Sequence, residues 1–384
     1  MKKILAMVLA LVMVLGLASC GLVGQEAPAP AEKPAASAPA ASAPAASTPS
    51  TSGDAAAAER PVYTNTTETQ GKSNEIVIKF SHGAAETAPP VKASLSMFAP
   101  EVEFNSNGRI GVEVYSNAQI GDDTTATEML IAGQLEMVNP STAPLVGYVP
   151  ELGIFDIPFL FNDEAEADAI CGGEVGDYLN AKLESKGLIN LAWNENGFRE
   201  LTNSKREVAS VADVAGLKIR TMENEFHEEL WNSLGANATP MSSSELYTAL
   251  EQGTVDGEEN PVANFYAYQF QEVQDFVSFT NHIYSPFLCL FSKQIWDTYD
   301  ADAQAIVADA AEKYGVEEKA INRADAQTCL QSCIDDYGMT VTYLDDAAKA
   351  EFVAKTAHIQ DMVAEETGSE IMDILNAAKA AYKG

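Results

Sequence analysis

Residues 214–262 have the sequence VAGLKIRTMENEFHEELWNSLGANATPMSSSELYTALEQGTVDGEENPV, and this stretch decides the fold class. Its segment 217–220 alternates in the manner of a strand, and apolar residues at helical spacing from Phe226 onward predict a helix. The serines at 242–244 predict the start of a second helix, and Gly253 predicts its end. The stretch therefore sets an arginine at the end of a strand, close to two helix starts. In an open α/β sheet, that edge is where small anions bind.

The segments on either side alternate strands and helices, which predicts a mostly parallel sheet. Before the central stretch we expect strands over 74–80, 110–115, 135–139 and 188–194, helices over 90–105, 123–131 and 164–186, and the start of a second unit at 154–160. After it we expect a buried strand over 288–291, a helix over 301–336, a strand over 339–344 and two closing amphipathic helices. The helix over 301–336 is much longer than the average of about 11 to 12 residues.

Several short motifs follow one another in a fixed order. Inside the central stretch they are GLKIR at 216–220, TPM at 239–241, SELYTALEQGTVDG at 244–257 and the EENP turn at 258–261; outside it they are GDD at 121–123, NGFRELTNS at 196–204 and TNH at 280–282. In this order they resemble the signature of DctP-type solute-binding proteins of tripartite ATP-independent periplasmic (TRAP) transporters. The resemblance covers most of the chain after the amino-terminal region.

The resemblance implies an α/β, two-lobed, periplasmic-binding-protein-like fold. Each lobe would be a mixed, mostly parallel sheet flanked by helices, and the long helix would cross both lobes. The first lobe is expected to comprise residues 71–196 and 286–325, and the second lobe residues 197–285 and 326–384. The chain would then cross between the lobes near 195–199 and return near 284–286.

The amino-terminal region predicts export and a lipid anchor. Residues 1–19 have a basic start and an apolar core, which is typical of a signal peptide, and Leu17 to Cys20 resemble the lipobox of bacterial lipoproteins. The alternative is an uncleaved transmembrane anchor, but the apolar run is shorter than the ~20 residues that a span needs. Residues 20–70 are rich in Ala, Pro, Ser and Thr, so we expect a linker without a packed core.

Composition narrows the function classes. The net charge of −33, from 23 basic and 56 acidic residues, argues against binding to nucleic acid or lying flat on an anionic membrane. It also repels anionic solutes at long range. Because the Debye length at physiological salt is only ~8 Å, enclosed arginines can still attract an anion locally.

The sequence contains no motif that predicts catalysis or a metal site. It has no GxSxG, no P-loop and no GxGxxG after a strand, and the helix start at 227–231 (HEELW) lacks the second histidine of a zinc protease. Cys329 and Cys333 are four residues apart in a helical segment, a poor geometry for a disulfide. We expect these two cysteines, with Cys171 and Cys289, to be free, although an exported location permits a disulfide between distant cysteines.

Three residues are the main candidates for binding a carboxylate. Arg220 ends its strand, and the resemblance implies that it forms a two-pronged salt bridge with the solute carboxylate. Arg199 follows the presumed crossing between lobes, and the resemblance makes it a second carboxylate contact; the alternative is an internal ion pair, for instance with Glu195 or Glu200. Asn260 in EENP is implied to reach the solute with its amide, although asparagine before proline is often only a turn residue.

Five further candidates follow from their positions in loops. His82, Asp123 and Ser141 are expected at the strand ends of the first lobe, where they could contact the other end of the solute. In the family, relatives that bind sialic acid carry an acidic residue where Ser141 stands, so Ser141 argues against that solute. Tyr266 and Gln269 follow the EENP motif, and the alternative for Tyr266 is core packing.

The resemblance implies an extracytoplasmic solute-binding protein that captures a small organic acid, such as a C4-dicarboxylate or a sugar acid, and delivers it to a TRAP membrane permease. It would be held at the cell membrane through lipid on Cys20, in the periplasm or on the outer face of the cytoplasmic membrane. No cofactor, metal or catalytic activity is expected. The alternatives are a surface-anchored glycoside hydrolase and an adhesin. Turnover of oligosaccharides would favour the hydrolase, and the absence of stoichiometric organic-acid binding would favour the adhesin.

Overall fold

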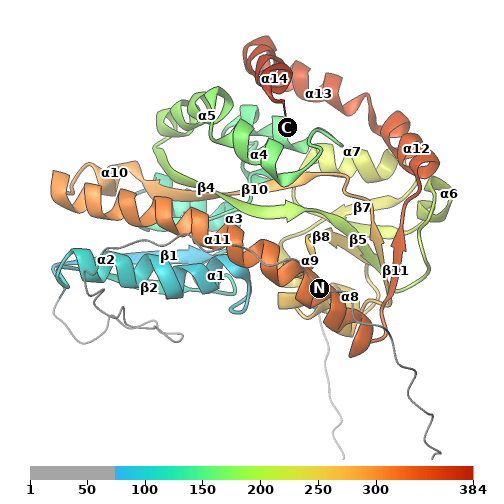
Figure 1. The fold of residues 1–384 in the computed structure, drawn as a ribbon, viewed down its shortest axis with the longest axis horizontal. Helices are drawn as coiled ribbons and strands as arrows, with labels where there is room; N and C mark the ends of the chain where they lie inside the picture. The colour runs from blue at the N-terminus through green and yellow to red at the C-terminus, as the bar shows by residue number, and fades with distance from the viewer. Residues whose placement is uncertain (1–73, 384) are drawn as a thin grey trace, which may run out of the picture. The chain divides into compact units, whose positions relative to one another are not determined.

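A computed structural model describes residues 74–383, which form two mixed sheets flanked by helices (Figure 1). The predicted signal peptide and the whole predicted linker, including Cys20, lie outside the described residues. In the described part of the chain, no helix is both long enough and apolar enough to span a bilayer.

The first sheet has the strand order β2-β1-β3-β10-β4. Its strands are β1 (Ile76–His82), β2 (Ile110–Tyr115), β3 (Met137–Asn139), β4 (Leu188–Phe198) and β10 (Tyr284–Ser292). β1 pairs in parallel with β2 and β3, whereas β10 pairs antiparallel with β3 and β4. Since β1, β2 and β3 run in one direction, the loops after them meet at one edge of the sheet.

The second sheet has the strand order β11-β9-β5-β8-β6-β7. Its strands are β5 (Glu200–Asn203), β6 (Lys218–Thr221), β7 (Asn237–Pro240), β8 (Gly257–Asn260), β9 (Phe276–Phe279) and β11 (Thr340–Tyr343). β6 runs parallel to β7 and β8, and β5 runs antiparallel to β8 and β9. The central stretch of the sequence thus supplies three adjacent strands of this sheet.

Helices cover both sheets. In the first lobe they are α1 (Pro89–Ala93), the π-helix η1 (Ser94–Phe98), α2 (Ala99–Asn105), α3 (Asp123–Ile131), the 3-10 helices η2 (Ala143–Leu145) and η3 (Pro150–Asp156), α4 (Glu164–Cys171), α5 (Glu174–Ser185) and α10 (Lys293–Trp296). In the second lobe and the carboxyl-terminal region they are α6 (Val211–Val214), α7 (Glu225–Ser233), α8 (Ser243–Glu251), α9 (Val262–Ala267), the 3-10 helix η4 (Phe270–Glu272), α12 (Asp346–Thr356), α13 (Ile359–Thr367) and α14 (Ser369–Ala381).

The expected long helix is α11 (Ala301–Asp335), a single helix of 35 residues. Asp300 caps it by accepting a hydrogen bond from the backbone N–H of Ala303. Figure 1 shows α11 running past elements of both sheets, and it packs against α1 and β4 of the first lobe and against α9 of the second. A continuous helix that contacts both lobes limits how far they can move independently.

The structure confirms the two-lobed α/β fold with mixed sheets, and it corrects several local expectations. The segment EENP belongs to strand β8 and not to a turn, because Glu258 and Glu259 pair with β5. The helix expected over 164–186 is two helices, α4 and α5, separated by Gly172 and Gly173. Three helices close the chain instead of two. Ser242 occupies the N-cap position of α8, but its hydroxyl bonds to that of Ser244 and not to a helix N–H.

The two sheets divide near the expected crossing, since β4 ends at Phe198 and β5 begins at Glu200. The carboxyl-terminal helices were expected in the second lobe. In the structure α14 packs against α4 and α5, and α13 packs against both η3 and α7. These helices therefore join elements of the two lobes. In the described residues all four cysteines, Cys171, Cys289, Cys329 and Cys333, are free, as expected.

Candidate functional site

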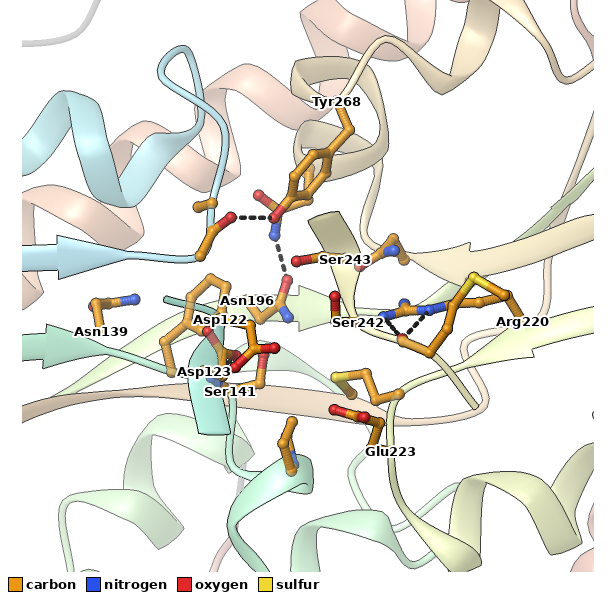
Figure 2. A pocket seen from close by; sticks show the side chains of 18 residues that line it. Asp122, Asp123, Asn139, Ser141, Asn196, Arg220, Glu223, Ser242, Ser243 and Tyr268 are labelled. Atoms are coloured by element: carbon orange, nitrogen blue, oxygen red, sulfur yellow. Dashed lines mark hydrogen bonds between the residues drawn. The ribbon is translucent and has the colours of Figure 1, made fainter. Parts of the chain in front are cut away.

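A cavity of about 590 Å³, including the part that opens to solvent, lies where loops of both sheets meet (Figure 2). The first sheet and its loops contribute Gly83, Ala84, Asp122, Asp123, Asn139, Ser141, Pro144 and Phe287; β4 contributes Asn196; and the second sheet, its loops and α9 contribute Arg220, Met222, Glu223, Met241, Ser242, Ser243, Asn260, Asn264 and Tyr268. Most of these side chains are polar.

Arg220 brings a positive charge to this cavity. It lies on β6 and is only 3% exposed, because the neighbouring strands β7 and β8 cover it on both sides. Its Nε and Nη2 donate hydrogen bonds to the carbonyl oxygen of Met241, at 2.8 and 2.6 Å (Figure 2). Burial lowers the pKa of Arg220, yet a guanidinium remains charged in proteins. Among the described residues, no carboxylate lies within ion-pair distance of it.

Arg199 has a different environment. It is completely buried and does not line the cavity. Its Nε and Nη2 donate to the carboxylate of Glu259, with Nη2 at 2.9 Å from Oε1, and Nη2 also donates to the backbone carbonyl of Glu259. Nη1 is buried without a hydrogen-bond partner in the described structure. Arg199 therefore lies outside the cavity lining with its charge paired by Glu259, and its contact with the solute carboxylate stays a prediction.

The partner carboxylate, Glu259, is the centre of a buried polar network. Its Oε2 lies 3.1 Å from Nε2 of His282, and its Oε1 lies 3.8 Å from Nδ1 of His227. His227 in turn places Nε2 2.9 Å from Asp156. Burial alone would raise the pKa of Glu259, but the positive charge of Arg199, a hydrogen bond from His282 and the nearby charge of His227 hold it well below its usual range. The network joins η3 of the first lobe to β8 of the second, so it belongs to the frame of the molecule.

Three carboxylates line the cavity: Asp122, Asp123 and Glu223. Asp122 caps α3 by accepting from the N–H of Thr125 at 2.8 Å. Asp123 accepts a hydrogen bond from the N–H of Ser141 at 2.9 Å. Burial raises the pKa of Asp123 to about 6, although that hydrogen bond and the charge of Arg220 act in the opposite direction. The cavity therefore contains acceptors for hydroxyl groups as well as a cation.

Amide and hydroxyl groups complete the wall. Asn260 donates through Nδ2 to Glu258 at 2.5 Å, and the amides of Asn196 and Asn264 bond to each other. The hydroxyl of Tyr268 on the second lobe donates to the carbonyl oxygen of Gly83 on the first, at 3.2 Å. This last bond joins the lobes directly beside the cavity.

The structure brings together four of the predicted site residues and leaves the others outside. Arg220, Asn260, Asp123 and Ser141 line the cavity. His82 is fully buried beneath it, where its Nε2 lies 3.0 Å from the hydroxyl of Ser94, and burial lowers its pKa to about 3, so it is neutral.

Tyr266 and Gln269 also lie outside the cavity, in a neighbouring groove against α1 and α11. Gln269 follows the end of α9 in a left-handed backbone conformation with φ of 64°. His82, Tyr266 and Gln269 are thus not among the residues that line this cavity, and their contacts with the solute stay predictions.

Sequence reasoning missed several lining residues. Tyr268 lines the cavity, whereas Tyr266, two positions earlier, does not. Which of the two faces the cavity depends on where α9 ends, at Ala267. Ser242 and Ser243 were assigned to helix capping alone. Asn139 is the last residue of the strand predicted over 135–139 and was not named as a site residue, although a polar residue at the carboxyl end of a buried strand is a signal for a binding edge.

Comparison with known proteins agrees with this architecture. Residues 80–367 match the family model described as bacterial extracellular solute-binding protein, family 7 (DctP). A solute-binding protein of Verminephrobacter eiseniae is 37% identical over 287 residues, which is 74% of this chain and 84% of the relative. The C4-dicarboxylate-binding periplasmic protein DctP of Rhodobacter capsulatus is 33% identical over 308 residues, or 79% of this chain and 91% of the relative.

A solved structure shares the fold over nearly the same range. The sugar acid binding protein DctPAm of Advenella mimigardefordensis, in complex with galactonate, aligns with a TM-score of 0.78 and 36% identity and covers 81% of this chain and 100% of its own. The chain belongs to the DctP family of extracellular solute-binding proteins. It is a TRAP-type solute-binding protein for a small organic acid, and it works with TRAP permease subunits.

Proposed function

We propose that this chain captures a sugar acid, meaning a monocarboxylate with several hydroxyl groups, and delivers it to its TRAP permease. The observation that supports this class is the pairing of one guanidinium without a carboxylate partner, Arg220, with three carboxylates in the same cavity. Arg220 would bind the solute carboxylate through the donors that Met241 does not occupy. Planar N–H groups suit a carboxylate, and a desolvated cation gains most from such a partner.

The opposite wall distinguishes a sugar acid from a dicarboxylate. A second solute carboxylate would meet Asp122, Asp123 or Glu223, and like charges in an enclosed site repel strongly. A hydroxyl group can instead donate to these carboxylates and accept from the amides and from Ser141. The relative bound to galactonate supports a sugar acid as the solute, whereas the relative named for C4-dicarboxylates supports a dicarboxylate.

The proposal includes binding without chemical conversion. The cavity contains no histidine and no cysteine, so its serine hydroxyls have no imidazole base to activate them. A solute recovered unchanged after long incubation with the purified protein, as followed by nuclear magnetic resonance, supports a binding role. Conversion of the solute would favour a hydrolase.

The proposal also includes a lipid anchor on Cys20, supported by the lipobox-like residues before it. Expression of the full chain should yield a protein that fractionates with membranes. In cells supplied with labelled fatty acid, the wild-type protein should incorporate the label and the variant Cys20→Ser should not. Equal labelling of both proteins, or no labelling of either, would contradict lipid attachment at this residue.

The solute class can be tested by isothermal titration of the full folded chain with galactonate, gluconate, succinate and malate. We expect the two sugar acids to bind at least about tenfold more tightly than the two dicarboxylates, since one unfavourable charge contact costs at least ~1.4 kcal/mol. In Asp123→Asn the preference should shrink, because the amide no longer repels a second carboxylate. Tighter binding of succinate than of galactonate by the wild-type protein would contradict the proposed class.

A further inference from the structure

The amide of Asn139 is a hydrogen-bond donor that the protein itself leaves unused. Asn139 ends β3, is 1% exposed and lines the cavity. Its Nδ2 has no partner in the described structure. Leaving a buried donor unpaired costs about 1–3 kcal/mol, so such a group calls for a partner that arrives with the solute.

Two hydrogen bonds to the oxygen of the Asn139 amide hold this side chain in its orientation. Its Oδ1 accepts from Nδ2 of Asn194 at 3.0 Å and from the hydroxyl of Tyr314 at 2.8 Å. Tyr314 belongs to α11 and is fully buried against Phe80 and Phe98. The bond from Nδ2 of Asn194 requires an oxygen at that position, and with Oδ1 accepting both bonds the amide nitrogen faces the cavity, as Figure 2 shows for Asn139.

The position of Asn139 determines which part of the solute it can meet. Arg220 lies in the second lobe and Asn139 in the first, and Figure 2 shows them at opposite ends of the group of lining side chains. A solute whose carboxylate is on Arg220 must extend across the cavity to reach Asn139. A short acid would leave the amide unpaired, whereas a longer one would place an oxygen against it.

We infer that Asn139 is a specificity-determining residue that donates a hydrogen bond to a hydroxyl oxygen at the end of the solute remote from its carboxylate. Tyr314 and Asn194 are positioning residues that hold the amide in this orientation. The inference rests on the proposed sugar-acid function. It adds that affinity depends on the length of the solute and should rise when the solute becomes long enough to reach Asn139.

The test is titration of the full folded chain and its variants with glycerate, erythronate and galactonate, which are acids of increasing length. For Asn139→Ala we expect galactonate binding to weaken by roughly 5- to 100-fold, and glycerate binding to change by less than about twofold. The control is Asn190→Ala. Asn190 lies on the same strand as Asn194, bonds to Asn180 and does not line the cavity, so its loss should leave affinity for all three acids unchanged.

A second variant covers the case in which Asn139→Ala does not fold. Tyr314→Phe removes one hydroxyl and leaves the ring in place, so the amide of Asn139 can rotate. We expect a loss of roughly two- to fivefold for galactonate and none for glycerate. Its control is Tyr299→Phe, since Tyr299 packs against Phe291 and Trp296 outside the cavity. A structural role alone would weaken all three acids equally.

The outcomes separate the two proposals. If the wild-type protein binds none of these acids and binds succinate instead, the proposed solute class fails. If it binds galactonate but the Asn139→Ala and Tyr314→Phe variants lose the same factor for all three acids, or lose nothing, the role of Asn139 is overturned. A loss that grows with solute length in both variants supports it.

Discussion

Of the arginines in the described residues, only Arg199 and Arg220 are buried, and the two have opposite environments. Arg199 precedes β5, which pairs antiparallel with β8, and in that register Leu201 lies opposite Glu259. A carboxylate is therefore built in beside Arg199. Arg220 lies on β6 beside the backbone of Met241, which offers it only a carbonyl oxygen. Equal burial does not give equal partners: the adjacent strand gives Arg199 a carboxylate, whereas Arg220 has only a carbonyl oxygen, which is why we propose Arg220 as the cation that binds the solute.

The largest expected effect concerns the stability contributed by Arg199. In Arg199→Ala the carboxylate of Glu259 would remain buried without its cation, so we expect the free energy of unfolding to fall by about 3–5 kcal/mol. Urea denaturation of the solute-free protein measures it. The control is Arg109→Ala, whose partner Asp300 lies at the surface, and it should lose much less. Unchanged stability together with lost solute binding would show instead that Arg199 contacts the solute, and would remove the contrast with Arg220.

The next effect concerns binding by Arg220. In Arg220→Ala we expect the free energy of solute binding to become less favourable by about 2–5 kcal/mol, because the solute carboxylate would be enclosed without a cation. Stability should fall by less than in Arg199→Ala, since only the hydrogen bonds to the carbonyl of Met241 are lost and no carboxylate of the protein loses an ion-pair partner. Arg220→Lys should also bind poorly, because an ammonium group cannot reproduce two parallel N–H donors. Calorimetry that gives an unchanged dissociation constant for Arg220→Ala would contradict the assignment.

The contrast also explains how far the sequence could predict this molecule. Local patterns were sufficient for β2, α3 and α11, since each depends on periodicity and capping within one segment. Arg220 was found because its strand and the loop after it are both local. The EENP segment was misjudged because Asn and Pro favour turns, while pairing with β5 determines a strand. The pairing partner lies far away in the sequence.

The same limit applies to the site. The environment of Arg199 depends on Glu259, which is 60 residues later in the chain, and the alternatives considered from the sequence were its neighbours Glu195 and Glu200. Similarly, the unused donor of Asn139 is defined by Tyr314, which is 175 residues away on α11. A single sequence gives no information on such tertiary pairs, so it identifies the residue types of a site more readily than their roles.

The pH dependence of stability is a smaller effect that distinguishes the environment of Arg199 from that of Arg220. Burial alone would lower the pKa of His227, but the hydrogen bond to Asp156 and the negative charges of Asp156 and Glu259 outweigh burial and raise it to about 9, above the usual 6.5. A raised pKa means that the charged imidazole stabilises the fold. This contribution is complete below pH 6.5, and it is lost as the pH rises through about 9. The effect belongs to the network around Arg199 and not to the cavity around Arg220.

We therefore expect the difference in unfolding free energy between the wild-type protein and His227→Gln to be about 1–3 kcal/mol near pH 6 and to shrink toward pH 10. Comparing the two proteins is necessary because burial also raises the pKa of Glu200 to about 8 and of Glu258 to about 7. Both carboxyls lower wild-type stability as the pH rises from their usual pKa of 4.5 to these values, which overlaps the lower part of the range for His227. Those contributions cancel in the difference. Urea denaturation at a series of pH values measures it. A difference that does not vary with pH would mean that His227 is neutral, and that Arg199 alone compensates the charge of Glu259.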